Sequence, residues 1–194
     1  MIHVITAYSR PENKDLLIKH LEGKVNWTVL TDLDDKFPSW VNVIKLYVEE
    51  GWRPDMSVFN QWLDLGIEDE TQYMFLNDDG FVEEPFWEKI PDENIVIVSA
   101  KRGEHIPNLN KAFENTPLIA DEKNMRVGYV DLEQMIVKGK ILKNYRFSNN
   151  PMGDGILAES LVGHPDIVYL KDVFMLFNYL EDGRFDSFNR TMLK

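Results

Sequence analysis

The stretch "YMFLNDDGFVEE", residues 73–84, places two adjacent carboxylates directly after a run of apolar residues. Residues 73–76 are typical of a buried strand, which ends here in an amide, the acids Asp78 and Asp79, and a glycine. Asn, Asp and Gly are common turn formers, so "NDDG" alone indicates a turn. The functional alternative is a divalent-cation site. Mg²⁺ and Mn²⁺ prefer carboxylate oxygens, and one or two carboxylates suffice when substrate phosphates supply the remaining ligands.

A second polar segment, "TAYSRP" at residues 6–11, lies between an expected strand and an expected helix. Capping of that helix by Ser9 or Asn13 explains it structurally. Tyr8 and Arg10 in the same loop also have the chemistry to face a nucleotide. An aromatic ring can stack on a base, and a guanidinium can bind phosphate.

Two further aspartates stand where an element begins or ends. Asp32, in "TD", follows the second expected strand, where it either caps a turn or accepts a hydrogen bond from a base or a ribose. Asp154, in "NNPMGDG" at residues 149–155, stands near the start of an expected helix. Capping is its default role, and general-base catalysis is the alternative.

Composition excludes several classes of protein. The 33 acidic residues outnumber the 21 basic ones, and a net charge of -12 disfavours nucleic acid and anionic membranes as partners. The absence of cysteine excludes disulfides, thiolate metal sites and thiol catalysis. No GxSxG, Walker or GxGxxG motif occurs, which disfavours serine hydrolases, P-loop enzymes and dinucleotide oxidoreductases. The four histidines lack metal-ligand spacing.

Alternating patterns predict the elements that position these residues. Strands are expected at 3–7, 27–31, 72–77, 94–100, 127–132 and 166–170, and helices at 12–23, 40–51, 55–66 and 154–163. The alternation in the first half predicts parallel strands joined by crossover helices, with mixed or antiparallel strands added later. Ligands of such sheets bind beyond the carboxyl ends of the strands, where "NDD" would lie. The start of the chain is typical of a strand rather than a signal peptide, and no apolar run could span a bilayer, so we expect a cytoplasmic protein.

The order of these motifs, from "TAYSRPE" through "TD", "FNQWLDLG" and "LNDDG" to "GDGILAESL", resembles small GT-A fold glycosyltransferases over residues 2–180. Among members of that family, the chain is similar to compact virus-encoded and bacterial sugar transferases. The resemblance implies an α/β fold with a central mixed, mostly parallel sheet flanked by helices. It also implies a single domain at 1–194, with a nucleotide-binding half at 1–100, an acceptor- and sugar-binding half at 101–180 and a tail at 181–194.

The resemblance also implies roles for individual residues. Asp32 matches the acid that hydrogen-bonds uracil, and "NDD" stands in place of the family's DxD motif, so that Asp79 is the metal ligand. Asn178 falls where a metal-binding histidine commonly completes the site, and Asp154 matches the catalytic acid of the family's "ED" pair. The nucleotide-binding residues implied are Thr6, Ala7, Tyr8, Arg10, Asp32, Asn60, Asn77 and Asp78.

The expected activity is therefore metal-dependent transfer of a sugar from a UDP-sugar, with Mn²⁺ or Mg²⁺, to an acceptor hydroxyl on a glycan or glycoprotein. A protein of net charge -12 repels a diphosphate, and a bound cation would offset that repulsion. Two alternatives stay open. A sugar-nucleotide nucleotidyltransferase would need a glycine-rich basic loop after the first strand, and "AYSRPENK" has no glycine. A non-catalytic carbohydrate- or protein-binding module would use the 12% aromatic residues and need no metal.

Overall fold

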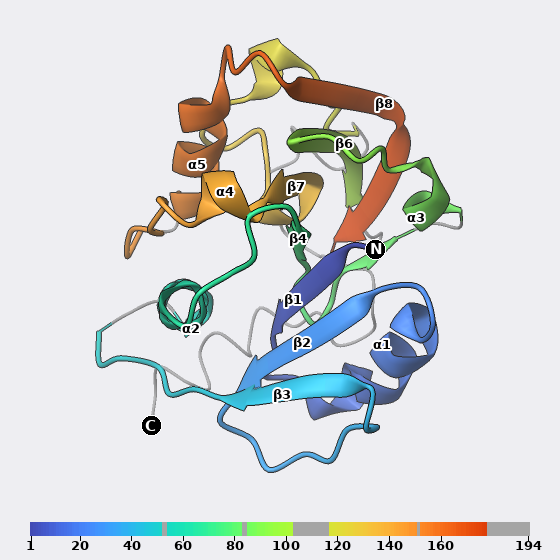
Figure 1. Ribbon diagram of the computed structural model, residues 1–194, viewed down its shortest axis with the longest axis vertical. Coiled ribbons are helices and arrows are strands. Elements are labelled where there is room, and N and C mark those ends of the chain that lie inside the picture. The colour runs from blue at the N-terminus through green and yellow to red at the C-terminus, as the bar shows by residue number, and fades with distance from the viewer. Residues whose placement is uncertain (52–53, 83–84, 103–116, 151, 178–194) are drawn as a thin grey trace.

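The computed structural model describes residues 1–51, 54–82, 85–102, 117–150 and 152–177. Eight strands form one sheet in the order β3-β2-β1-β4-β7-β6-β8-β5 (Figure 1). The strands are β1 (His3–Ala7), β2 (Asn26–Thr31), β3 (Val41–Lys45), β4 (Gln72–Phe75), β5 (Phe81–Val82), β6 (Ile95–Arg102), β7 (Met135–Lys138) and β8 (Ile167–Phe177). The helices are η1 (Pro11–Asn13), α1 (Lys14–Leu21), α2 (Pro54–Asp64), α3 (Phe86–Lys89), η2 (Glu122–Asn124), η3 (Leu132–Gln134), α4 (Gly139–Leu142) and α5 (Gly153–Leu161).

The first half of the sheet is parallel and the second half is mixed. β1 pairs in parallel with β2 and β4, and β2 pairs in parallel with β3. β7 is antiparallel to both β4 and β6, whereas β8 runs parallel to β6. This arrangement confirms the predicted α/β class with a central, mostly parallel mixed sheet.

Helices cover both faces of the sheet. Figure 1 shows α1 and α3 on one side of the strands and α2, α4 and α5 on the other. Successive strand residues point to opposite faces, so Val4 joins the core under α1 and α3 while Ile5 joins the core under α2 and α5. Burial on both faces explains why β1 and β4 are almost continuously apolar. Within the described ranges, no helix has the length and hydropathy to cross a bilayer.

Two predicted elements were wrong. Residues 40–51 do not form a helix, because 41–45 form β3, which pairs along its length with β2. The β-branched residues Val41, Val43 and Ile44 suit a strand, and pairing with β2 outweighed the helical spacing. Residues 127–132 do not form a strand: 127–129 form a turn, with Gly128 at a φ of 80°, and Leu132 begins η3. The strand β7 follows at 135–138.

Candidate active site

The parallel strands bring three of the predicted polar segments to one edge of the sheet. Ala7 at the end of β1 lies beside Leu30 of β2, and the amide of Leu76, just after β4, donates to the carbonyl of Ile5. Parallel strands end at the same edge, which Figure 1 shows for the arrowheads of β1 and β2. The loop after β1, the end of β2 and the turn at 77–80 therefore face one side of the molecule, as predicted.

Asp78 fastens the turn after β4 to the loop after β1. Its Oδ2 accepts the backbone N–H groups of Ser9 at 2.6 Å and Arg10 at 2.7 Å. Its Oδ1 pairs with the guanidinium of Arg10, and its own carbonyl accepts the side-chain amide of Asn13 at 2.9 Å. With its side chain 2% exposed, Asp78 uses its oxygens to hold the first loop in place.

Asp79 shares the guanidinium of Arg10. Its Oδ1 lies 3.2 Å from Nη1 of Arg10, and both side chains are buried. Burial raises the pKa of Asp79 to about 6, against the lowering effect of Arg10, and the charge of Asp78 adds to the rise. A phosphate contact by Arg10 would therefore have to be shared with two carboxylates.

Glu133, which no sequence pattern indicated, contacts the start of the acidic turn. Its side chain is 1% exposed, and its Oε1 accepts the backbone N–H of Asn77 at 2.5 Å. Burial, followed by the charges of Asp131 and Asp79, raises the pKa of Glu133 well above its usual range. The signal that finds it is the antiparallel pairing of β4 with β7. Met74 faces Ile136, and continuing that register sets residue 77 opposite 133.

Two of the predicted nucleotide-binding residues, Thr6 of β1 and Tyr8 just after it, are buried. The hydroxyl of Thr6 accepts the indole N–H of Trp27 at 3.0 Å. Tyr8, 3% exposed, packs edge-on against Phe37 and donates its hydroxyl to Asp35 at 3.2 Å. Burial raises the pKa of Tyr8, with the charge of Asp35 adding to it. The ring of Tyr8 thus belongs to the core beside α1, and stacking on a base would require it to leave Phe37.

The remaining predicted residues of this edge differ in exposure. Ala7 ends β1 half-buried, and the side chain of Asn77 is half-buried at the start of the turn. Asp32, directly after β2, is exposed and makes no hydrogen bond to any described residue. The carboxylate of Asp32 is therefore open to a ligand.

Asn60 anchors the segment that leads to Asp154. Its amide nitrogen donates to the carbonyl of Phe147, and its Oδ1 accepts the N–H of Phe147, both at 2.8 Å. This two-point contact links α2 to the loop before α5, and Gly153 packs close to the sulfur of Met56 on α2. The structure thus gives Asn60 a supporting position under the loop, with both ends of its amide engaged.

Asp154 stands half-buried in the first turn of α5. Its Oδ1 accepts the N–H of the adjacent Gly155 at 2.8 Å. Nearby, the hydroxyl of Tyr145 donates to the carbonyl of Gly153 at 3.1 Å. Burial, and then the charge of Asp154, raises the pKa of Tyr145 to about 12. The structure brings Arg10, Asp78 and Asp79 into direct contact but places Asp154 on a separate element. Asn178 lies outside the described residues.

One acid of the turn, Asp79, has the chemistry of a metal ligand, provided that a bound molecule shares the ion. Asp79 offers a hard carboxylate oxygen and Asn77 an amide oxygen, the donor types that Mg²⁺ and Mn²⁺ prefer. Asp78 does not fit as a ligand, because its oxygens already accept from the first loop. Among the described residues no group of three or more His, Asp or Glu side chains is placed to hold an ion. Phosphate oxygens or residues beyond those described would have to complete the coordination.

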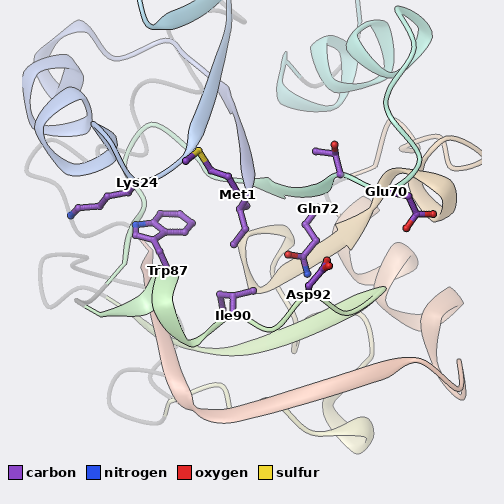
Figure 2. Close-up of a pocket in the computed structure, with 9 residues that line it drawn as sticks. Met1, Lys24, Glu70, Gln72, Trp87, Ile90 and Asp92 are labelled. Atoms are coloured by element: carbon purple, nitrogen blue, oxygen red, sulfur yellow. The ribbon is translucent and has the colours of Figure 1, made fainter.

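A cavity of about 400 Å³ opens at the other end of the strands. Residues that precede or begin β1 and β4 line part of it, and Trp87 of α3 and the segment after α3 line another part. Figure 2 shows Trp87, Met1 and Gln72 around it, with Glu70 and Asp92 at one side. Lys138 pairs with both of these acids, at 3.4 and 3.1 Å. The cavity lies at the opposite end of the strands from Asp78 and Asp79, so it does not contribute to the candidate site.

Comparison with known proteins bears on the fold alone. No known family model and no curated protein sequence matches the chain. The structure of residues 1–349 of S. aureus TarS in complex with UDP aligns at 14% identity and a TM-score of 0.54, covering 91% of this chain and 60% of that chain. The chain has the fold of a GT-A glycosyltransferase.

A second TarS structure, in complex with UDP-GlcNAc, aligns at 12% identity and a TM-score of 0.53, covering 94% of this chain and 60% of that chain. A glycosyltransferase involved in the glycosylation of the major capsid of PBCV-1 aligns at 12% identity over 100% of this chain and 99% of that chain, with a TM-score of 0.44. The chain spans about 60% of the TarS chains that it matches.

Proposed function

We propose that this protein is a glycosyltransferase that moves a sugar from a UDP-sugar to an acceptor hydroxyl on a glycan or glycoprotein. One observation carries the proposal: Asp78 fastens the loop after β1 to the acidic turn after β4, at the carboxyl edge of a sheet with the GT-A fold. Ligands of such sheets bind at that edge. The two TarS structures hold UDP and UDP-GlcNAc, which supports a UDP-linked donor.

On the donor side, we assign the uracil to Asp32 and the diphosphate to the loop at residues 6–10. Asp32 is exposed at the end of β2, where its carboxylate can accept the N–H of the base. The loop is fixed in advance by Asp78, so binding of the donor does not have to order it. Arg10 supplies the positive charge nearest the acidic turn.

A divalent ion is part of the proposal, with Asp79 as its ligand and Asn178 as the ligand that the resemblance implies. Such an ion supplies a positive charge that stabilises the departing diphosphate. Asp79 would offer the ion a hard carboxylate oxygen at a fixed position. The position is fixed because Asp79 follows β4 and its carboxylate pairs with the buried Arg10. Asn77 and Asp78 hold the turn that presents it.

On the acceptor side, Asp154 is the proposed general base. An acceptor hydroxyl is a poor nucleophile, and a carboxylate within hydrogen-bond reach removes its proton as the new bond to the sugar forms. The bond from the sugar to UDP breaks in the same step, and its electron pair leaves with UDP. Asp154 suits this role because it is half-buried at the start of α5, and Asn60 of α2 holds the backbone of Phe147 in the segment that leads to it.

The test is calorimetric titration of the whole chain with UDP, with and without Mn²⁺, and with ADP as the control nucleotide. The expected result is binding of UDP that strengthens with Mn²⁺, and weaker binding of ADP. Equal binding of UDP and ADP would contradict a pocket specific for uracil. Absence of any nucleotide binding would favour a carbohydrate- or protein-binding module. Release of UDP from a UDP-sugar on addition of glycan acceptors then tests transfer itself.

A further inference from the structure

We propose that Glu133 is a positioning residue for the donor site, which sets the shape of the turn at 77–80 and thereby the placement of Asp78 and Asp79. The turn carries two carboxylates of the candidate site, yet Glu133 comes from a distant part of the sequence. This inference rests on the proposed function for its consequence in donor binding, but its structural part can be tested separately.

The first support is the place of Glu133 in the sheet. It lies on η3, just before β7, at the position opposite Asn77 when the β4–β7 register is continued. Its Oε1 accepts the N–H of Asn77 at 2.5 Å. The last strand-like amide before the acidic turn is therefore held by a side chain instead of a backbone carbonyl.

The second support is the close approach of Gly80. A Cβ atom at this position would lie 2.5 Å from Oε1 of Glu133 and 2.8 Å from Cδ1 of Leu76. The N–H of Gly80 donates to the carbonyl of Asn77 at 3.0 Å, which closes the turn. The turn therefore wraps around the carboxyl of Glu133, and glycine is the residue that allows it.

The third support is the rigidity of the element that carries Glu133. Asp131 and Gln134 form a capping box around η3, with the N–H of Asp131 bonded to Oε1 of Gln134 at 3.0 Å. The amide nitrogen of Gln134 also donates to the carbonyl of Val98 on β6 at 2.9 Å. The backbone of Glu133 is thus fixed to the centre of the sheet before its side chain meets the turn.

The fourth support is that stability alone does not favour this residue. The carboxyl is fully buried among the acids Asp79 and Asp131, and its Oε2 has no hydrogen-bond partner among the described residues. Burying a carboxyl without complete partners is unfavourable, so a core selected only for stability would place an apolar or amide side chain here. A contact that is unfavourable for stability but shapes a binding turn is typical of a functional site.

The experiment compares E133A, E133Q and G80A in the whole chain, with Q72A as the matched control. Gln72 is also buried and bonds to backbone carbonyls, but at the opposite end of β4 beside the cavity in Figure 2. Two quantities are measured: hydrogen exchange of the amides of residues 77–80, and the affinity for UDP with Mn²⁺.

Exchange of the turn amides should rise in E133A and G80A, while E133Q, which keeps an oxygen for the N–H of Asn77, should restore protection. Affinity for UDP with Mn²⁺ should fall about 10–100-fold in E133A and G80A, as for other residues that support a ligand-binding carboxylate. A double variant, E133A/G80A, is made as well. Its loss of UDP affinity should be smaller than the two single losses combined, since E133A removes the atom that a Cβ at position 80 would meet. Q72A should lower the melting temperature without either effect.

Unchanged exchange of the turn amides in both G80A and folded E133A would overturn the proposal, whether or not UDP binds. Loss of protection with unchanged UDP affinity would limit Glu133 to a structural role, which also contradicts it. If the parent chain binds no UDP while the exchange pattern holds, the proposed function fails and the positioning contact stands.

Discussion

The acidic turn after β4 and the start of α5 carry the two sets of carboxylates in the candidate site, and they are built differently. Asp78 and Asp79 are buried, with exposures of 2% and 3%, and contact the loop after β1 through backbone and guanidinium groups. Asp154 is half-buried and accepts the N–H of its neighbour Gly155. The carboxylates of the turn are therefore held by groups from a distant segment, whereas the carboxylate of Asp154 accepts a backbone N–H of its own helix.

This difference in support determines which properties a substitution in each region will change. A change in the acidic turn removes contacts that also hold the fold, so it affects binding and stability together. The start of α5 is supported from outside, by Asn60 against Phe147, so the carboxylate of Asp154 can be changed while its support remains. The acceptor side can therefore be tested by rate, and the donor side needs a measure of folding beside the measure of binding.

The largest effect should come from D154N, which keeps the shape and hydrogen bonding of the side chain and removes its charge. Loss of a general base should lower the transfer rate by about 10²–10⁴-fold, with UDP affinity nearly unchanged. The measurement is turnover of a UDP-sugar beside calorimetric titration with UDP. Near-parental turnover with a melting temperature several degrees lower would make Asp154 a helix cap and remove the contrast between the regions.

The next effect concerns D79A, which removes the best-placed hard oxygen of the turn. Enhancement of UDP binding by Mn²⁺ should be lost, a decrease of about 10–100-fold, and addition of EDTA to the parent should give the same affinity. The control is D34A, because Asp34 is an exposed acid that pairs with Lys45 outside the turn. Mn²⁺ enhancement that survives in D79A would show that the metal site lies elsewhere.

Several features of this comparison could be predicted from the sequence. The apolar runs that end at Ala7, Thr31 and Leu76 are buried strands, and the polar residues after them do meet at one edge. Those patterns are local, because a strand buried on both faces is apolar throughout and its loop is not. The same local logic found α2 and α5.

What could not be predicted depends on contacts between segments far apart in the chain. Asp78 binds Arg10 across 68 residues, Glu133 binds Asn77 across 56, and Asn60 binds Phe147 across 87. No local pattern contains the register of β7 against β4, so Glu133 resembles any charged residue near a strand. The spacing of residues 40–51 predicts a helix for the same reason, because the pairing of β3 with β2 is not visible in that segment alone.

A smaller effect, on stability, should follow N60A. It removes both hydrogen bonds to Phe147 and leaves the backbone groups of that residue unpaired, at about 1–3 kcal/mol. For a chain of this size that corresponds to a melting temperature about 2–4 °C lower per kcal/mol. The transfer rate should also fall, because the segment before α5 loses its contact with α2. The affinity for UDP should stay unchanged, because the acidic turn keeps its contacts. A loss of UDP affinity instead would place Asn60 in the nucleotide pocket.

The smallest expected effect is on the exposed acid of the donor side. Asp32 lies open at the end of β2, so D32A breaks no hydrogen bond between described residues and should leave the melting temperature unchanged. The proposed bond to uracil would form in exchange for bonds to water, which limits its expected contribution to about 0.5–1.5 kcal/mol, or roughly 2- to 13-fold in UDP affinity. The affinity for ADP should not change, since the contact is to the base. D34A serves again as control, because Asp34 lies two residues further along the same loop. A parental UDP affinity in D32A would assign Asp32 to the turn after β2, and the proposed donor side would then consist of buried and half-buried groups.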